Sequence, residues 1–293
     1  MAIEDKIKCY RDKINDMLKF YMKGKDSKVD KIYEVAKYSL ISGGKRIRPV
    51  LMLLVGEMFG VSKDKLMPFA CALEMIHTYS LIHDDLPAMD NDDYRRGHLT
   101  NHKVYGEAMA ILSGDALLNK AYEIMLDESL NGGRESILAA KEIANSAGMD
   151  GMIGGQVKDL EIVGKVVSAD ELEYVHKLKT GCLIKASVMA AAHLANATHE
   201  EKSSLDRFSQ KLGLAFQIKD DILDVIGDKK SLGKSVGKDK EESKTTYVSV
   251  YGLNQAMLYL EDTTNDAIAS LRIFGDEAKD LVAMAEYLLN RKY

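Results

Sequence analysis

Proline, tryptophan and cysteine are scarce in this chain of 293 residues, which has three prolines, no tryptophan and three cysteines. Because proline removes a backbone donor and clashes inside a helix, its rarity permits long helices. Cys9, Cys71 and Cys182 lie far apart and form no C-x-x-C pair. Their spacing therefore indicates neither a zinc site nor a disulfide framework, and a reducing compartment is favoured.

The sequence also lacks a long apolar run, and its charge shows no basic excess. Runs such as residues 50–55 are far too short to span a bilayer. The first twenty residues mix charges throughout and have no apolar core of a secretory signal. The net charge of −5 disfavours a nucleic-acid partner, which needs a basic face. We expect a soluble, cytoplasmic protein without a stable membrane anchor.

Helical periodicity dominates what remains, and 46% of the residues are hydrophobic, as in globular proteins. Apolar residues recur every three or four positions, and no alternating β-branched stretch is bounded by hairpin turns. The pattern predicts an all-α fold in one domain, residues 1–293. Predicted helices cover residues 66–83, 107–126, 136–153, 169–195, 201–226, 254–274 and 277–289.

Local signals mark the ends of these helices. Ser168 begins a capping box, and glycine pairs at 43–44, 132–133 and 154–155 punctuate the pattern. Residues 227–244 form the longest polar stretch. We interpret that stretch as a surface loop, and long loops in compact domains often act as lids.

Two clusters of aspartates, each after an apolar helical run, carry the strongest chemical signal. Packed carboxylates repel by roughly 4 kcal/mol per pair at 4 Å and an effective dielectric of 20. Such clusters must lose protons, stay spread in water or bind cations, and their oxygen ligands suit Mg²⁺. Either cluster alone can be a solvated helix end, but finding the arrangement twice favours metal binding. The clusters are Asp84, Asp85, Asp90, Asp92 and Asp93, and then Asp220, Asp221 and Asp224.

The first cluster has a predicted local geometry. Pro87 disfavours a helical Leu86, so the helix should end there and let the chain bring Asp90 back near Asp84. An EF-hand starting at Asp90 fails, because its sixth position is Arg95 rather than glycine.

The second cluster lies within a predicted helix. At 3.6 residues per turn, Asp220 and Asp224 share one face, which Gln217 and Gly213 continue. A P-loop at residues 233–235 fails, because position 228 is aspartate instead of glycine and no strand precedes it.

Basic groups accompany both clusters. Glycine lets the backbone approach an anion closely, and arginine offers a bidentate fork for phosphate oxygens. Taken alone, any one of these lysines is better interpreted as an ordinary solvated side chain. A lone histidine on a helix, such as His77, more often has a structural role than a functional one. Together with the carboxylates, they describe a site that holds metal-bridged polyanions and releases one as a leaving group. The cations are Lys45, Arg46, Arg48, Arg95, Arg96, Lys179, Lys234, Lys238 and Lys244.

These motifs resemble the trans-prenyl diphosphate synthases over nearly the whole chain, and most closely the bacterial-type farnesyl diphosphate synthases. HDDLPAMDNDDYRRG at 83–97 matches the first aspartate-rich motif, with the longer bacterial spacing, and FQIKDDILD at 216–224 matches the second. GGKRIRP, TNHKVYGEAMAILSGDALL, GMIGGQVKDL and KTG agree in order. The departures are Tyr94, His98-Leu99 and Ala190-Ala191-Ala192, none of which removes a charged site residue.

The resemblance implies a bundle of mostly antiparallel helices around a deep central cavity, usually as a homodimer. It implies three Mg²⁺ ions in the substrate complex, and isopentenyl diphosphate and an allylic diphosphate as substrates. The implied metal ligands are Asp84, Asp85, Asp90, Asp220, Asp221 and Asp224, and the implied catalytic groups are Asp84, Asp85, Asp90, Lys179, Asp220 and Asp221. The implied contacts are Arg95, Lys179, Thr180, Gln217 and Lys234 for the allylic substrate, and Gly44, Lys45, Arg48, His77 and Arg96 for isopentenyl diphosphate.

The implied reaction is the condensation of isopentenyl diphosphate with dimethylallyl and then geranyl diphosphate, which gives farnesyl diphosphate. The allylic C–O bond ionises, the isopentenyl double bond attacks the carbocation, and a proton leaves. An apolar cavity wall would shield the cation from water.

Product length depends on the helix before the first motif. Tyr79 lies five residues before Asp84, about 7.5 Å further along a helix and about 140° around it. In the family a bulky aromatic here acts as a floor that stops the chain at fifteen carbons, whereas Ser80 is small. Tyr79 can equally be a core aromatic, and a geranylgeranyl diphosphate synthase is the alternative.

Two other classes fit less well. A class I terpene cyclase needs an N-D-x-x-S-x-x-x-E motif, but Asn265-Asp266 is followed by Ala269 and Ile273 at the Ser and Glu positions. A cyclase also has no need of the GGKRIRP cluster. A non-catalytic subunit would show decay of an aspartate motif, and both motifs are intact here.

Overall fold

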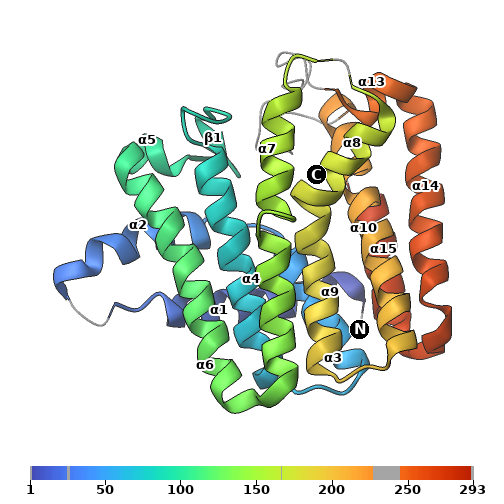
Figure 1. The fold of residues 1–293 in the computed structure, drawn as a ribbon, viewed down its shortest axis with the longest axis horizontal. Helices are drawn as coiled ribbons and strands as arrows, with labels where there is room; N and C mark the ends of the chain where they lie inside the picture. Colours follow the sequence, from blue (N-terminus) through green and yellow to red (C-terminus); the bar gives the residue numbers. More distant parts are fainter. Residues whose placement is uncertain (1, 25–26, 166, 227–244, 292–293) are drawn as a thin grey trace.

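Long helices run side by side around a shared apolar core (Figure 1). The computed structural model describes residues 2–24, 27–165, 167–226 and 245–291. The only strands in that part of the chain are two short ones of two residues each, so the predicted all-α class is confirmed. The helices are α1 (Ile3–Tyr21), α2 (Asp30–Ile41), α3 (Ile47–Met58), α4 (Lys63–Asp84), α5 (Asn101–Tyr105), α6 (Glu107–Ala147), α7 (Met152–Ile162), α8 (Ala169–His176), α9 (Cys182–Leu194), α10 (His199–Ile226), α13 (Tyr247–Tyr251), α14 (Leu253–Ser270) and α15 (Lys279–Asn290). Shorter turns are η1 (Ser27–Val29), the π-helical η2 (Lys177–Gly181) and η3 (Arg272–Ala278).

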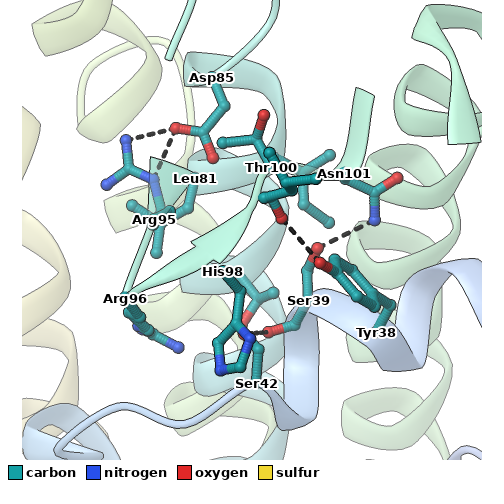
Figure 2. Close-up of a pocket in the computed structure, with 13 residues that line it drawn as sticks. Tyr38, Ser39, Ser42, Leu81, Asp85, Arg95, Arg96, His98, Thr100 and Asn101 are labelled. Atoms are coloured by element: carbon teal, nitrogen blue, oxygen red, sulfur yellow. Dashed lines mark hydrogen bonds and ion pairs between the residues drawn. The ribbon is translucent and has the colours of Figure 1, made fainter. Parts of the chain in front are cut away.

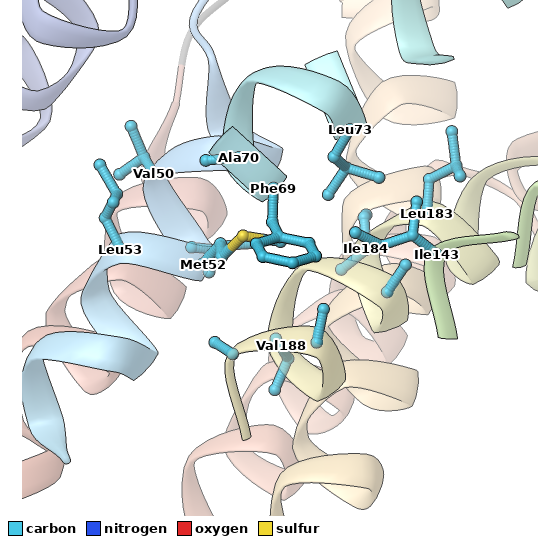
Figure 3. Packing of buried hydrophobic residues seen from close by; sticks show 14 of the residues in the cluster. Val50, Met52, Leu53, Phe69, Ala70, Leu73, Ile143, Leu183, Ile184 and Val188 are labelled. Carbon is cyan, nitrogen blue, oxygen red and sulfur yellow. The ribbon is translucent and has the colours of Figure 1, made fainter. Parts of the chain in front are cut away.

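Helix α4 lies within the core and packs against α3, α6 and α9. Its Phe69 is fully buried and lies among Met52 of α3, Ile143 of α6 and Ile184 and Val188 of α9 (Figure 3). Burying a side chain of this size stabilises the fold by about 1.5–3 kcal/mol. The packing fixes α4 firmly, and the first aspartate motif follows directly from its end.

Two glycine pairs behave differently from each other. Gly133 has non-helical torsions (φ 72°, ψ −163°) and breaks α6, as the sequence predicts. Gly154 and Gly155, in contrast, lie inside α7, so the expected interruption there is wrong. A Cβ on Gly155 would fall 2.2 Å from the backbone nitrogen of Lys179. Glycine is required at this position because α7 and η2 approach each other so closely.

The predicted helix over 169–195 is divided into three parts. Ser168 caps α8 as expected, with its Oγ accepting a hydrogen bond from the Glu171 N–H at 3.3 Å. Residues 177–181 then widen into the π-helical turn η2 before α9 continues. Such turns are rare and are found frequently at functional sites.

A small antiparallel hairpin, β1 (Tyr94–Arg95) and β2 (His98–Leu99), was not expected from the sequence. Its two central residues, Arg96 and Gly97, both have positive φ, 55° and 79°. Two such residues form the type I′ turn that matches the twist of short hairpins. The usual Asn-Gly signal is absent, because arginine stands at the first position.

The hairpin, α7, α8 and α13 gather at one end of the helices, the upper end in Figure 1. The stretch predicted as a surface loop, residues 227–244, lies outside the described residues. In the part of the chain that the structure describes, no helix combines the length and apolarity needed to cross a bilayer.

We predict that Gly155→Ala destabilises the protein and displaces η2, because the added methyl group would overlap the Lys179 backbone. Overpacking of this kind costs about 1–3 kcal/mol. Urea unfolding measures the loss. Gly148→Ala is the control, since its Cβ would meet only atoms at 3.4 Å; equal stability of both variants would contradict the prediction.

Candidate active site

The first aspartate motif begins at the last residue of α4 and turns back on itself. The Asp90 N–H donates to the Asp84 carbonyl oxygen at 2.9 Å, so the predicted return of the chain is confirmed. On α4, partial exposure recurs at His77, Ser80 and Asp84, while most residues around them are buried. This spacing defines one face of the helix, which ends at the motif.

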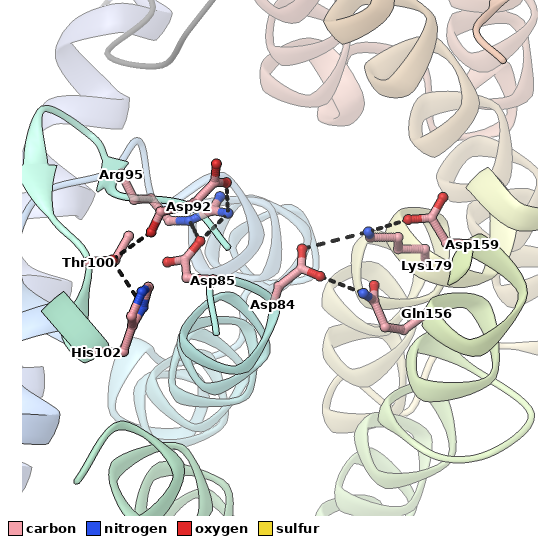
Figure 4. Close-up of polar contacts among 9 residues, drawn as sticks. All are labelled: Asp84, Asp85, Asp92, Arg95, Thr100, His102, Gln156, Asp159 and Lys179. Atoms are coloured by element: carbon pink, nitrogen blue, oxygen red, sulfur yellow. Dashed lines mark hydrogen bonds and ion pairs between the residues drawn. The ribbon is translucent and has the colours of Figure 1, made fainter. Parts of the chain in front are cut away.

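Asp84 is held by groups from two other elements (Figure 4). Its carboxylate accepts a hydrogen bond from Gln156 Nε2 of α7 at 2.5 Å and lies 3.6 Å from Lys179 Nζ of η2. Lys179 also pairs with Asp159 at 2.7 Å. Burial disfavours its charge, but Asp84 and Asp159 together raise the pKa of Lys179 above its usual range. A charged lysine therefore lies against the first motif.

Asp85 lies on the other side of α4 and is only 4% exposed. Arg95 of β1 donates from Nε to Asp85 Oδ1 at 2.6 Å, and its Nη2 lies 3.3 Å from Asp92. Burial raises the pKa of Asp85 to about 6, although Arg95 opposes the shift. Asp85 and Arg95 border a small recess between α2, α4 and the hairpin (Figure 2). The pair fastens the hairpin to α4.

The second motif, near the end of α10, is connected to η2. Thr180 Oγ1 donates to Gln217 Oε1 at 3.0 Å, and Gln217 Nε2 donates to Asp221 Oδ1 at 3.1 Å. Gly213, one turn before Gln217, lies so close to Gly181 that a Cβ would be 3.1 Å from its Cα. The face predicted from the sequence thus packs on the turn that carries Lys179.

Asp220 is paired with a residue from the far end of the chain. Arg291 Nη2 lies 2.6 Å from Asp220 Oδ1, and its guanidinium covers the Phe216 ring at 4.0 Å. The Asp220 side chain is 44% exposed, and Asp224, one turn later, is partly exposed. Seventy-one residues separate Arg291 from Asp220, so no sequence spacing could have indicated this pair.

The predicted isopentenyl contacts lie around the start of α3. Arg48 Nη1 is 3.4 Å from His77 Nε2 of α4. Arg96 Nη1 donates to the Gly43 carbonyl at 2.7 Å, and a Cβ on Gly44 would fall 2.7 Å from the Arg96 guanidinium carbon. The structure therefore brings Arg48, His77, Arg96 and Gly44 together from three separate segments.

Burial controls the charge of these groups. Burial and nearby arginines lower the pKa of His77 well below 6.5, so its imidazole is neutral at pH 7. Burial and then Arg291 lower the pKa of Lys45 to about 8. Arg46 has a different role, because it is fully buried and pairs with Glu74 at 2.6 Å, which holds the loop in place. Lys234 lies outside the described residues.

Tyr79 belongs to the core, where it is 5% exposed. Its ring meets His83 edge-on at 5.7 Å, and His83 in turn contacts the Ile111 carbonyl of α6. Burial, then Tyr122, raises the pKa of Tyr79 to about 12. Ser80, on the partly exposed face, donates to the His77 carbonyl. Tyr79 therefore lies beside that face, as its angle around the helix predicts.

The carboxylates fit a divalent cation that is shared with a ligand. Among the described residues, no three acidic, histidine or cysteine side chains converge closely enough to hold a metal ion by themselves. Instead Lys179 pairs with Asp84, and Arg291 pairs with Asp220. Mg²⁺ typically takes one or two carboxylates and completes its shell with water and phosphate oxygens. Carboxylates from the two motifs would provide such a donor set if a phosphate-bearing ligand lay between them.

Four residues in this region were not singled out from the sequence. Gln156 and Asp159 lie in the GMIGGQVKDL motif, and their three-residue spacing places them on one face of α7. This spacing, directly after the glycine pair 154–155, was the feature of the sequence that could have indicated both residues. Arg291 and Tyr247 gave none, because their contacts with α10 join distant segments.

These features define an all-α, polyanion-binding enzyme whose acidic helix ends face cationic turns. The polyprenyl synthetase family model matches residues 29–281. A farnesyl diphosphate synthase of Micrococcus luteus is 42% identical over 292 residues, 99% of each chain. A geranylgeranyl diphosphate synthase of Cyanophora paradoxa is 45% identical over 262 residues, 89% of this chain and 87% of that one. An FPP/GFPP synthase structure from Zymomonas mobilis superposes with a TM-score of 0.88 at 32% identity, covering 98% of both chains.

The chain belongs to the polyprenyl synthetase family, and it is a prenyltransferase. The resemblance seen in the sequence is thereby confirmed. The relatives carry names with different products, so membership of the family leaves the product length to be argued from the site.

We predict an acid sensitivity that originates at His176, whose ring packs against that of Tyr247 with centroids 5.6 Å apart. Burial lowers the pKa of His176 to about 4. The unfolded chain binds a proton near pH 6.5 but the folded protein does not, so stability present above pH 6.5 is lost as the pH falls towards 4. The loss is about 3 kcal/mol at most. Urea unfolding at pH 7, 5.5 and 4.5 should show a smaller decline for His176→Phe; parallel declines would rule the effect out.

Proposed function

We propose that this protein condenses isopentenyl diphosphate head-to-tail with dimethylallyl and then geranyl diphosphate, with Mg²⁺, to give farnesyl diphosphate. The observation that carries the proposal is the connection between the motifs. Asp84 contacts Lys179, and the adjacent Thr180 leads through Gln217 to Asp221. One turn of five residues therefore joins both acidic helix ends, where a diphosphate would be held from two sides.

The allylic diphosphate would lie between these ends. The magnesium ions, which neutralise the departing diphosphate when bound, would be held by the aspartates of both motifs: Asp84, Asp85, Asp90, Asp220, Asp221 and Asp224. Lys179 and Thr180 would contact its oxygens, together with Gln217, Arg95 and Lys234. Positioned cations of this kind stabilise charge as it develops on a leaving group. Lys179 retains its charge because Asp159 stays beside it.

Isopentenyl diphosphate would bind at the cluster of Gly44, Lys45, Arg48, His77 and Arg96. Two arginines offer planar forks to phosphate oxygens. His77, kept neutral by its surroundings, can hydrogen-bond a phosphate without adding repulsion to Arg48. The proton released after condensation would pass to the departed diphosphate.

The farnesyl product is supported by Tyr79 and by the relative from Micrococcus luteus, which aligns over 99% of the chain. The Tyr79 ring is packed against His83, so it has little freedom to move aside for a longer tail. The relative from Cyanophora paradoxa supports the alternative, geranylgeranyl diphosphate. A terpene cyclase is the weaker alternative, since it does not explain the basic cluster.

We also propose that the protein is a cytoplasmic homodimer with one domain over residues 1–293. Helix α6 carries several exposed apolar side chains that a second copy would cover. They are Ile111, Leu112, Leu126, Leu130 and Ile137.

The proposed activity is tested with labelled isopentenyl diphosphate, dimethylallyl diphosphate and Mg²⁺, followed by sizing of the products. We expect a fifteen-carbon product that disappears with a chelator. Asp84→Ala and Asp220→Ala should each lower the rate by orders of magnitude with an unchanged far-UV spectrum. Exposed Asp262 on α14 provides the control, Asp262→Ala. Near-normal turnover of either motif variant at saturating Mg²⁺ would contradict the proposal that the two motifs hold the metal ions.

We predict that Tyr79→Ala lengthens the products to twenty carbons or more, because it removes a ring beside the face that ends at Asp84. Ser80→Ala is the matched control and should leave the product size unchanged, since that side chain is already small. Chromatography of the dephosphorylated products gives the answer. Mainly twenty-carbon products from the wild type, or no change in Tyr79→Ala, would place the floor elsewhere.

A further inference from the structure

The two neighbouring aspartates of the second motif have different surroundings. Asp220 keeps 44% side-chain exposure, whereas Asp221 is only 4% exposed. The first motif shows a smaller difference in the same direction, because the Asp84 side chain is 14% exposed and that of Asp85 is 5% exposed. In each pair the second carboxylate is directed into the protein.

Both oxygens of Asp221 already accept hydrogen bonds within the protein. Oδ1 accepts from Gln217 Nε2 at 3.1 Å, and Oδ2 accepts from the backbone N–H of Tyr247 at 2.8 Å. Tyr247 is the first residue of α13, where the helix itself supplies no acceptor for that N–H. Asp221 therefore joins α10 to α13.

Tyr247 continues this connection through its ring. The ring is 5% exposed and packs on His176, with centroids 5.6 Å apart at an angle of 31°. His176 ends α8 and immediately precedes η2. Within η2, Thr180 donates to Gln217, which returns to Asp221. The contacts form a closed circuit around the turn that carries Lys179.

We infer that Asp221 has a positioning role: with Tyr247 it holds α13 against His176 and so fixes η2. Its effect on the allylic diphosphate rests on the proposed function. Loss of the Asp221 carboxylate would leave the Tyr247 N–H and the Gln217 amide unpaired in a buried environment. Buried donors without partners are strongly disfavoured.

The first test is the thermal unfolding of metal-free protein in the presence of a chelator. Asp221→Asn replaces one carboxylate oxygen by an NH2 group that faces one of the two donors, and we expect its midpoint to fall by about 3 °C or more. Asp262→Asn, on the exposed face of α14, removes the same charge and should leave the midpoint unchanged. An unchanged midpoint in Asp221→Asn would overturn the inference, because a residue needed only for metal has no effect when metal is absent.

The second test isolates the backbone hydrogen bond. Tyr247→Ala removes the ring but keeps the N–H, whereas Tyr247→Pro removes both. Proline suits the first residue of a helix, and Thr246 has the extended torsions (φ −128°, ψ 165°) favoured before proline. In metal-free protein Tyr247→Pro should unfold at a lower temperature than Tyr247→Ala. The difference should vanish when Asp221→Leu, which has no acceptor, is present in both. A difference that is the same in both backgrounds would contradict the coupling.

The third readout separates positioning from a general loss of structure. Tyr247→Pro should raise the KM for the allylic diphosphate about tenfold, which corresponds to one charge-assisted hydrogen bond. The KM for isopentenyl diphosphate should change less than about twofold, because Arg48 and His77 belong to other segments. Equal effects on both KM values would overturn the positioning role. If the wild type forms no product, the proposed function fails, while the two metal-free tests still decide the role of Asp221.

Discussion

The structure depends on compensating the negative charge that two aspartate motifs bring to one end of the helices. Carboxylates at such close spacing cannot all remain charged without cations or hydrogen-bond donors. Lys179 and Gln156 compensate Asp84, Arg95 compensates Asp85, and Arg291 compensates Asp220. These partners come from α7, η2, β1 and the end of the chain. Charge compensation therefore draws the elements around the site into one arrangement.

The partners also show how the site can accept a ligand. Lys179 pairs with Asp84, whose side chain is 14% exposed, and Arg291 pairs with Asp220, whose side chain is 44% exposed. A divalent cation would take the place of these cations beside the carboxylates, and a diphosphate would pair with the cations that it displaces. The buried contacts of Asp85 and Asp221 are harder to exchange, because their donors would be left without partners. Each motif thus combines one exchangeable aspartate with one that anchors a neighbouring element.

Close backbone packing gives this arrangement its accuracy. Gly155 lets α7 touch η2, and Gly213 lets α10 touch the same turn at Gly181. The π-helical turn η2 therefore lies between α7 and α10. Its position is fixed further by the preceding residue, His176, which packs against Tyr247 of α13. Lys179 and Thr180 are consequently placed by the backbones of two helices, α7 and α10, and not only by their own contacts. A site that must orient a reacting diphosphate benefits from such rigid support.

Much of the fold class could be read from the sequence, because a helix buries its apolar residues with a period that depends only on its own geometry. The return of Asp90 towards Asp84 was also predictable, since Pro87 acts on its immediate neighbour. The hairpin at Arg96 was missed because its turn lacks the usual Asn-Gly signal. Gly154-Gly155 was misread as a helix break, because the sequence does not reveal that another backbone lies against Gly155.

The sequence by itself determined the helical class, the two acidic clusters, the basic segment and the family, since each is a property of residue type, order and local spacing. Only the tertiary structure decided which cation meets which carboxylate. Arg291 reaches Asp220 and Tyr247 reaches Asp221 across 71 and 26 positions. The physical reason is that ion pairs and hydrogen bonds act over a few ångströms in space. Their partners are selected by how the helices pack, and one sequence carries no local record of that packing.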